Sequence, residues 1–539
     1  MSAEPAPLVP ARSLTRKRQH DPSQHDSLRE YVQEKESHEL VFALAGYIGS
    51  GCSTLASPLL EALQTLSYDP AIISVSKLIE ARAPAEGSEG LIPRTQRLQA
   101  EGDKLRLEHG GSIVAGLIIR EIKNLRMTAA AEDDELLERA FIVDALKNPQ
   151  EEEMLRKVYG DSFYLIGVLA NEDTRKQRLA DSKFKYADEF KAKSVKDTAE
   201  HQTKIEKIMS DDASADALHG QRVKDLLERS DFFIANESNL DTKLLAKTFA
   251  DFVAAATESR VVRPTRDERG MQAAWSSSLK SSCMSRQVGA AILSKNGEVL
   301  AVGTNDPPKA GGGIYSHSPE GESDHRCFND PPGKGYCRND HQKREIYEQA
   351  FSIMQTEGIQ IGSVDDLAKI LKKTQVGALI EFSRAIHAEM DALLALVRTG
   401  TPLPPGSTLY TTVFPCHSCA RHIVAAGVSE VVYIEPFGKS MAIKLHGDAI
   451  ESISVAKSSD VPSKTEHPKV IFRLFTGVAP RRHAKLFEKK RDIKDKEHGN
   501  YLTHHDSKHI SPTLTRGFLD LEDDIAERVA GMLQEPSHE

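Results

Sequence analysis

The sequence stretches HAE, at residues 387–389, and PCHSC, at residues 415–419, decide the fold of the second half of the chain. A catalytic zinc ion binds three protein ligands and leaves a fourth position to water, whereas a structural zinc ion normally binds four. His387, Cys416 and Cys419 supply three ligands of the right type. A helix that begins at Cys416 places both cysteines on one face, since they are three residues apart. The two stretches therefore predict a catalytic zinc centre.

Glu389 indicates which reaction the predicted zinc centre catalyses. The order H-x-E followed by P-C-x-x-C resembles the signature of zinc-dependent nucleobase deaminases, in which the glutamate carries protons and is not a ligand. Zinc lowers the pKa of the water that it binds. We expect Glu389 to take a proton from that water and return it to the base. A structural zinc knuckle is the alternative, and such a knuckle has no use for Glu389.

The segments around both motifs predict the elements that position them. β-Branched and aromatic residues predict strands at 407–412 and 431–434, with a helix between them. Upstream, the Asn-Gly pair at 296–297 predicts a hairpin of strands at 288–293 and 298–302. The order hairpin, helix, strand, helix, strand indicates a cytidine-deaminase-like α/β/α sandwich with the metal at two helix N-termini.

The segment SSCMSRQVGAAILSKNGEVLAVGTNDPP, residues 281–308, resembles the start of deoxycytidylate (dCMP) deaminases. The resemblance implies that Asn305 contacts the nucleoside and that Arg286 faces a phosphate. Thr304 and Asp306 depart from the family pattern, which has tyrosine and glycine there, so the sugar and phosphate contacts stay open. Taken alone, an asparagine in this position before two prolines is typical of an ordinary turn.

The first half of the chain carries a second motif. An apolar strand at residues 39–45 leads into GYIGSGCST, residues 46–54, and then into an apolar-periodic helix. A Gly-rich loop between a strand and a helix is the context of a P-loop, whose backbone N–H groups bind phosphate oxygens. The loop residues expected to bind a nucleotide are Gly46, Gly49, Ser50, Gly51, Cys52, Ser53 and Thr54.

Cys52 occupies the position that holds lysine in the P-loop pattern. Because that lysine stabilises the charge of the transferring phosphoryl group, we expect the loop to bind a nucleotide without efficient transfer. Ser53 and Asp144, which ends an apolar strand, are the expected contacts for Mg²⁺. For Arg175 and Arg178, contact with phosphate and a solvated helix face are both open. Strands that alternate with helices predict a kinase-like parallel sheet in this half.

Together, the two halves resemble bacterial anti-phage dCTP deaminases. The resemblance implies a P-loop kinase-like domain at 38–255 and a deaminase domain at 260–478, which is interrupted by an insertion at 305–380. It implies zinc-dependent conversion of dCTP and dCMP into dUTP and dUMP with release of ammonia, which depletes the dCTP pool during phage infection. It also implies a homo-oligomer and, from some relatives, inhibition by a small RNA.

Other classes of protein remain as alternatives. They are a housekeeping dCMP deaminase, a nucleotide kinase with an appended zinc module, and a nucleotide-sensing switch with a structural zinc centre. A second, structural zinc ion is a further hypothesis, because some dCMP deaminases carry one in the equivalent insertion. Its candidate ligands are Cys283, His317, His325, Cys327, Cys337 and His341. The charged extension at 479–539 indicates a solvated helix, or a contact for RNA or another subunit.

Composition narrows the class further. The net charge of −9, the 6% aromatic content and the single tryptophan disfavour a cytosine or adenosine deaminase of nucleic acids, which needs a basic groove and stacking aromatics. Six cysteines without disulfide-type spacing favour a reducing cytoplasm. No apolar run approaches the roughly 18 residues of a membrane span. Residues 1–37 are polar, which is typical of a disordered tail.

Overall fold

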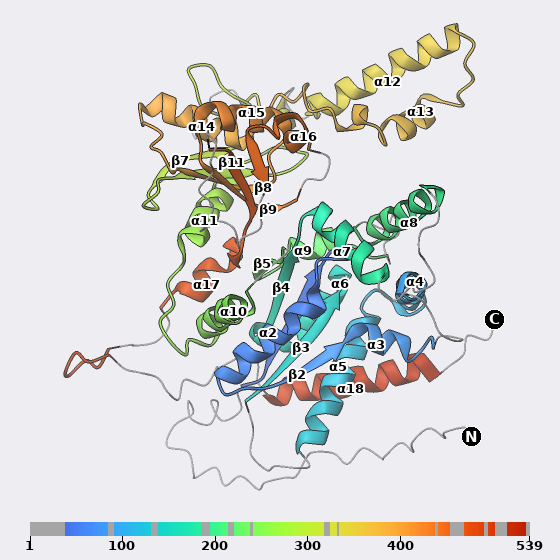
Figure 1. The fold of residues 1–539 in the computed structure, drawn as a ribbon, viewed down its shortest axis with the longest axis vertical. Coiled ribbons are helices and arrows are strands. Elements are labelled where there is room, and N and C mark those ends of the chain that lie inside the picture. The colour runs from blue at the N-terminus through green and yellow to red at the C-terminus, as the bar shows by residue number, and fades with distance from the viewer. Residues whose placement is uncertain are drawn as a thin grey trace.

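The computed structural model describes residues 38–84, 91–130, 138–184, 195–213, 220–237, 241–316, 324–330, 334–436, 440–452, 468–489, 494–501 and 515–534. Within them the chain forms two six-stranded sheets, each accompanied by helices (Figure 1). The first sheet is built mainly from the N-terminal half and the second from the C-terminal half. The predicted tail at residues 1–37 lies outside the described residues.

The first sheet has the strand order β12-β5-β4-β1-β3-β2. Its strands are β1 (Leu40–Gly46), β2 (Asp69–Ser74), β3 (Arg139–Leu146), β4 (Phe163–Leu169), β5 (Phe232–Ala235) and β12 (Gly477–Val478). All neighbours pair in parallel except β12, which is antiparallel to β5. Since β1 lies between β3 and β4, the Gly-rich loop leaves β1 where the strand order reverses. Ligands of open α/β sheets bind outside the carboxyl ends of the strands at such a point.

Alternating side chains of β1 explain the two helical layers of this sheet. Val41 and Ala43 join a buried cluster with α5, whereas Phe42 and Leu44 join one with α2 and α10. Successive side chains of a strand point to opposite faces, so both faces of β1 are covered. The helices are α2 (Cys52–Thr65), α3 (Val75–Glu80), α4 (Leu91–His109), α5 (Ile113–Ala130), α6 (Pro149–Tyr159), α7 (Glu172–Phe184), α8 (Val195–Ala213), α9 (Val223–Leu227) and α10 (Thr242–Thr257).

The second sheet has the strand order β10-β11-β9-β8-β6-β7. Its strands are β6 (Gly289–Leu293), β7 (Val299–Thr304), β8 (Thr408–Val413), β9 (Glu430–Glu435), β10 (Ile450–Ser452) and β11 (Val470–Leu474). The hairpin β6–β7 and the pair β6–β8 are antiparallel, and the remaining pairs are parallel. Its helices are α11 (Arg266–Ser278), α12 (Arg338–Thr356), α13 (Val364–Leu371), α14 (Ala388–Thr399), α15 (His417–Ala426) and α16 (Ala442–His446). Helix α17 (His483–Phe487) instead contributes Leu486 to a buried cluster of the first sheet.

Two glycines in the hairpin allow helices to approach both faces of this sheet. A Cβ atom on Gly289 would lie 1.9 Å from the carbonyl oxygen of Ala274 in α11, and one on Gly303 would lie 2.0 Å from that of Ala388 in α14. The two glycines are one position out of register in the β6–β7 pairing, so they point to opposite faces. Helices α11 and α14 therefore cover opposite faces, as the predicted α/β/α sandwich requires.

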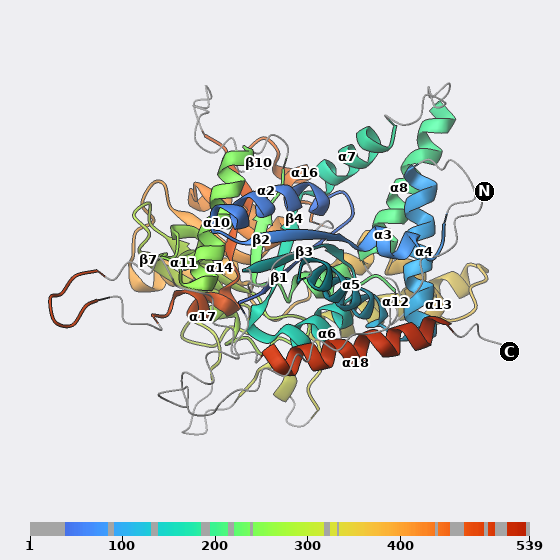
Figure 2. The ribbon, with the colours of Figure 1, turned by 90° about the horizontal axis from the view of Figure 1, so that it is seen from below.

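The C-terminal part of the chain returns to the first sheet. Helix α18 (Thr515–Gln534) lies against α5 and α6, and it contributes Phe518 to their buried cluster (Figure 2). The hydroxyl of Tyr159 donates a hydrogen bond of 2.7 Å to Glu522. Just after β12, Arg482 pairs with Asp231. The solvated helix expected for the charged stretch after β12 is therefore wrong at Arg481 and Arg482, because these side chains bind Ser230 and Asp231. Helix α18 adds to the core of the first sheet.

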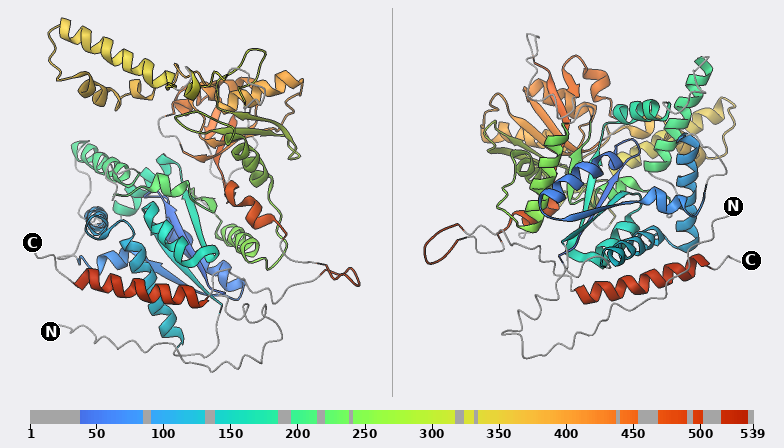
Figure 3. Two further views of the ribbon diagram at one scale, coloured as in Figure 1. Left: turned by 180° about the vertical axis from the view of Figure 1, so that it is seen from behind. Right: turned by 60° about the horizontal axis from the view of Figure 1, so that its bottom comes forward.

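The insertion projects from the second sheet as the helical pair α12 and α13 (Figure 3). Each of the two helices carries buried side chains, Tyr347 in α12 and Leu367 and Ala368 in α13. Only the N-terminal turns of α12 reach the main cavity of this half of the chain. In the part of the chain that the structure describes, no helix has both the length and the apolar character needed to cross a membrane.

Candidate zinc centre and substrate cavity

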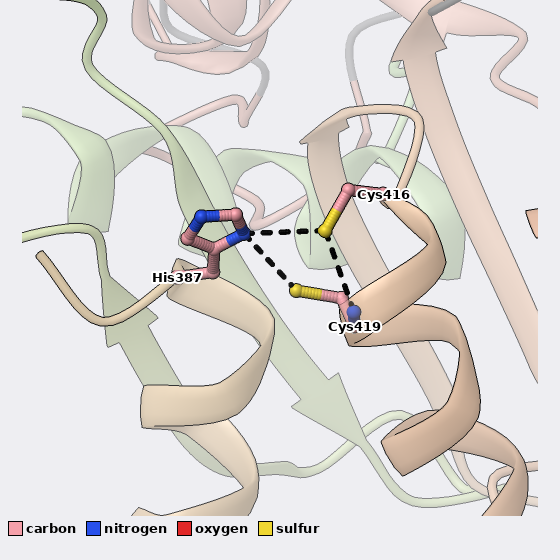
Figure 4. Close-up of side chains that lie close together, drawn as sticks. All are labelled: His387, Cys416 and Cys419. Carbon is pink, nitrogen blue, oxygen red and sulfur yellow. Dashed lines mark hydrogen bonds between the residues drawn. The ribbon is translucent and has the colours of Figure 1, made fainter. Parts of the chain in front are cut away.

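The N-termini of two helices bring three predicted zinc ligands together (Figure 4). His387 is the N-cap of α14, and Cys416 is the N-cap of α15, which also carries Cys419 in its first turn. The His387 Nδ1 atom lies 3.4 Å from the Sγ atom of Cys416 and 3.3 Å from that of Cys419. Among the described residues, these three side chains are the group whose donor atoms all lie within 4.8 Å of one another.

The electrostatics of this cluster favour a thiolate at Cys416, whereas the hydrogen bond with Cys416 and burial raise the pKa of Cys419 well above its ordinary value. A hydrogen bond from Cys419, against the opposing effect of burial and with help from His387, lowers the pKa of Cys416 to about 4. The hydrogen bond with Cys416 in turn raises the pKa of His387 to about 9. Backbone N–H groups at a helix N-terminus also stabilise thiolates. One imidazole and two thiols at this spacing fit a zinc ion with three protein ligands.

Glu389 lies in the first turn of α14, beside the cluster. Its side chain is 5% exposed, and the thiol of Cys419 donates a hydrogen bond of 3.4 Å to its Oε2 atom. Burial is the main cause that raises the pKa of this carboxyl group above its ordinary value. A carboxyl group with a raised pKa can both hold and release a proton near neutral pH.

A cavity of about 590 Å³ opens in front of the cluster. Its walls include His387, Glu389 and Cys416 together with Asn305 and Arg286. Two of the three predicted zinc ligands, the predicted proton carrier and the predicted substrate contacts therefore share one cavity. Their catalytic and binding roles stay predictions.

Asn305 supports the wall of the cavity through its side chain. Its Oδ1 atom accepts a 2.7 Å hydrogen bond from the backbone N–H of Val288, and its Nδ2 atom donates one of 2.7 Å to the carbonyl oxygen of Arg286. An amide has two donors and two lone pairs, so one of each remains for a substrate. The Arg286 side chain forms an ion pair with Glu435, which means that a phosphate would compete with this carboxylate.

The two positions that depart from the family pattern have internal partners. The Thr304 hydroxyl donates to the carbonyl oxygen of Ser277 at 2.8 Å, on the side of α11. The Asp306 carboxylate is fully buried and accepts hydrogen bonds from the backbone and hydroxyl of Ser282. Burial is the main cause that raises the pKa of Asp306.

Three cationic side chains on the cavity wall were not predicted. Arg338 and Lys343 come from the first turns of α12, and Arg384 precedes α14. The carboxylate of Asp330 lies 3.4 Å from Arg338 and 2.9 Å from Arg384, so one acid serves two guanidinium groups. The only sequence signal was the run of cations in the insertion, which has no motif spacing.

The candidate ligands of a second zinc ion do not form a complete set within the described residues. Cys283, Cys327 and Cys337 all line the cavity, and burial is the main cause that raises the pKa of Cys327. The Sγ atom of Cys337 lies 3.6 Å from the hydroxyl of Ser285. His317 lies outside the described residues. The second zinc stays a prediction.

The Gly-rich loop turns directly into α2. Gly49 and Gly51 have φ angles of 84° and 85°, a left-handed conformation that favours glycine. The Ser53 hydroxyl donates to Asp144 at 3.2 Å, which brings the two expected magnesium contacts together. Nucleotide binding by the loop remains a prediction.

Arg175 and Arg178 lie against the loop and not on a solvated face. Arg175 is 8% exposed, and its guanidinium group stacks over the ring of Tyr47 at 4.8 Å. Arg178 donates to the carbonyl oxygens of Gly49 and Ser50 at 3.4 and 3.3 Å. Of the two alternatives for these arginines, the structure favours a position from which they can reach a bound phosphate.

Comparison with known proteins identifies the second half of the chain. Residues 264–435 match the family described as the cytidine and deoxycytidylate deaminase zinc-binding region. The deoxycytidylate deaminase of Enterobacteria phage T4 is 30% identical over 172 residues, which are 32% of this chain and 78% of the phage protein. The T2 enzyme is also 30% identical over 172 residues, which are 32% of this chain and 80% of its own. The chain belongs to the deoxycytidylate deaminase family.

A solved structure of the dCMP deaminase from cyanophage S-TIM5, in its apo form, is 19% identical and covers 39% of this chain and 99% of its own. Its TM-score is 0.20, which is too low to carry a structural argument. The family match covers residues 264–435, so every strand of the first sheet, β12 included, lies outside it.

Proposed function

We propose that this protein hydrolyses the exocyclic amine of deoxycytidine nucleotides, converting dCTP and dCMP into dUTP and dUMP with release of ammonia. The observation that carries the proposal is the position of Glu389. It is buried beside His387 and the two cysteines, on the wall of the same cavity as Asn305 and Arg286.

His387, Cys416 and Cys419 would hold the zinc ion, which supplies activation of water as a nucleophile when bound. The carboxylate of Glu389 takes the proton of the attacking water. It delivers this proton to the ring nitrogen, then takes a second one from the hydroxyl group that the water has become and passes it to the departing amine, so that ammonia leaves and uracil remains. Burial assists this exchange because it raises the pKa of Glu389. The free donor and acceptor of the Asn305 amide orient the nucleoside.

The cations on the cavity wall support a nucleotide as substrate, in preference to a free nucleoside. Arg286, Arg338, Lys343 and Arg384 reach the cavity from different segments, and the acids on its wall are Asp306, Asp340 and Glu389. A phosphate chain gains from guanidinium and ammonium groups, and from the positive N-terminus of α12. We assign the phosphate end of the substrate to the α12 side of the cavity. The cations on that side suit the charge of a triphosphate.

The first sheet is proposed to bind a nucleotide, with little phosphoryl transfer because Cys52 replaces the loop lysine. We propose that the fused protein depletes the dCTP pool in defence against phage. The support is the pairing of a deaminase with a Gly-rich-loop sheet, which resembles anti-phage dCTP deaminases. A switch with a structural zinc centre is less well supported, because such a switch has no use for Glu389.

The proposal is tested with the purified, zinc-loaded chain and a panel of dCTP, dCMP, CTP, cytidine and a cytosine-containing single strand. Ammonia release and product identity are measured for each. We expect uracil products from dCTP and dCMP only. Activity confined to the single strand would make the protein a nucleic-acid deaminase and overturn the proposal.

A further inference from the structure

A buried ion pair lies against the Gly-rich loop. Asp212, near the end of α8, is fully buried. Its Oδ2 atom accepts a 2.6 Å hydrogen bond from the backbone N–H of Ile48, and its Oδ1 atom accepts one of 2.7 Å from the ammonium group of Lys147. Lys147 also donates to the carbonyl oxygen of Gly46 at 3.0 Å. A carboxylate and an ammonium group are thus held together at the mouth of the loop.

Both charges contact the backbone of the Gly-rich loop, Asp212 at the N–H of Ile48 and Lys147 at the carbonyl oxygen of Gly46. Successive backbone N–H groups of such a loop form a concave site for anions. The Asp212 carboxylate accepts one of them, from Ile48. Lys147 and Asp212 both act electrostatically on the thiol of Cys52, which stands where the pattern has lysine. The ammonium group absent at position 52 is therefore supplied from the end of β3.

The backbone before Lys147 is bent in a way that supports this role. Ala145 has a φ of 69°, and the pairing between β1 and β3 shifts register between Ala43 and Ala45. A left-handed conformation is unfavourable for alanine, and such strain gathers at functional sites. An irregularity of this kind re-aims the side chains that follow it. Asp144 and Lys147, on either side of it, both reach the loop region.

We propose that the Ile48 N–H and the Lys147 ammonium group form the anion site of the first sheet, which takes a phosphate group of a nucleoside triphosphate. Asp212 is its internal occupant in the absence of nucleotide. Because two anions cannot share the site, a nucleotide binds only by displacing this carboxylate. The inference rests on the proposed nucleotide binding of the first sheet and is independent of the deaminase cavity.

The test uses the zinc-loaded full chain and isothermal titration with Mg²⁺-ATP, Mg²⁺-GTP and inorganic tripolyphosphate. These probes carry no cytosine, and because their phosphate chains can also meet the cations of the deaminase cavity, the variants of the first sheet identify the site that responds. Asp212→Asn keeps the shape of the side chain but removes its charge, and it should tighten triphosphate binding about tenfold or more. Lys147→Met should weaken binding about tenfold or more, in the wild-type chain and in the Asp212→Asn background. The matched control is Lys157→Met, which breaks the exposed pair with Glu153 and should change nothing.

Each outcome decides the matter. Unchanged or weaker binding in Asp212→Asn, or wild-type affinity in Lys147→Met, overturns the proposal. If tripolyphosphate binds as tightly as ATP and responds to both variants, the site is supported and recognises the phosphate chain alone. A wild-type circular dichroism spectrum and cooperative urea unfolding show that each variant is folded. If Asp212→Asn fails this control, Lys147→Met alone decides. No triphosphate binding to any folded variant overturns nucleotide binding by the first sheet and leaves the deaminase proposal intact.

Discussion

Gly303 sets the distance between the hairpin and the helix that carries His387 and Glu389. A Cβ atom at this position would lie 2.0 Å from the carbonyl oxygen of Ala388 and 2.3 Å from the backbone nitrogen of Ala392. The nearer contact is about 1.4 Å shorter than the 3.4 Å at which ordinary contact begins, and both partners are backbone atoms. In Gly303→Ala, therefore, α14 has to move, and Ala388 lies between the predicted ligand and the predicted proton carrier.

We expect this variant to lose activity more than stability. Overpacking of a core costs about 1–3 kcal/mol in the free energy of unfolding. A displacement of about 1 Å at a reacting group costs roughly 100-fold in rate. Steady-state turnover of dCMP, zinc content per chain and urea unfolding are measured together. The control is Gly531→Ala in α18, where an added Cβ atom meets nothing within 4 Å. It should be neutral or slightly stabilising, because alanine favours a helix. Wild-type turnover in Gly303→Ala would refute the argument.

Three further variants test separate parts of the cavity. Glu389→Gln should retain its zinc, with one ion per chain, or two if the structural site exists, and its turnover should fall about 10²–10⁴-fold. Turnover near that of the wild type would show that Glu389 is not the proton carrier. Lys343→Met removes a cation from the assigned phosphate end of the cavity, so KM should rise more for dCTP than for dCMP. Equal changes in the two KM values in steady-state assays would contradict that assignment. Asn305→Ala leaves the Val288 N–H and the Arg286 carbonyl unpaired, so the free energy of unfolding in urea should fall by about 1–3 kcal/mol for each group. Unchanged stability would contradict the interpretation that Asn305 supports the cavity wall.

The zinc cluster could be predicted from the sequence because its ligands lie in short motifs at the starts of two helices. Cys416 and Cys419 share one helix turn, and both cluster-bearing helices begin where the ligands stand. The strands around them were predicted to within one or two residues, since β-branched runs and glycine-rich turns mark their ends. Gly427, for example, ends α15 in the left-handed conformation.

Contacts between distant segments had no such signal. Arg126 meets Glu522 across 396 residues, and nothing local in α18 reveals that its partner is α5. Lys147 and Asp212 pair across 65 residues, so the loop appeared to lack a lysine. Nothing in the sequence around Arg338 and Lys343 indicates that both residues lie on the cavity wall. The pattern of charges along one helix does not reveal which distant segment of the chain supplies the partners of those charges.

The most direct test of the central claim is the product that the zinc-loaded chain forms from dCTP, identified by chromatography with mass detection. The account predicts dUTP with its triphosphate intact, in step with ammonia, and a loss of both in Glu389→Gln. Formation of dCDP or dCMP without uracil, or equal uracil formation by Glu389→Gln, would contradict it.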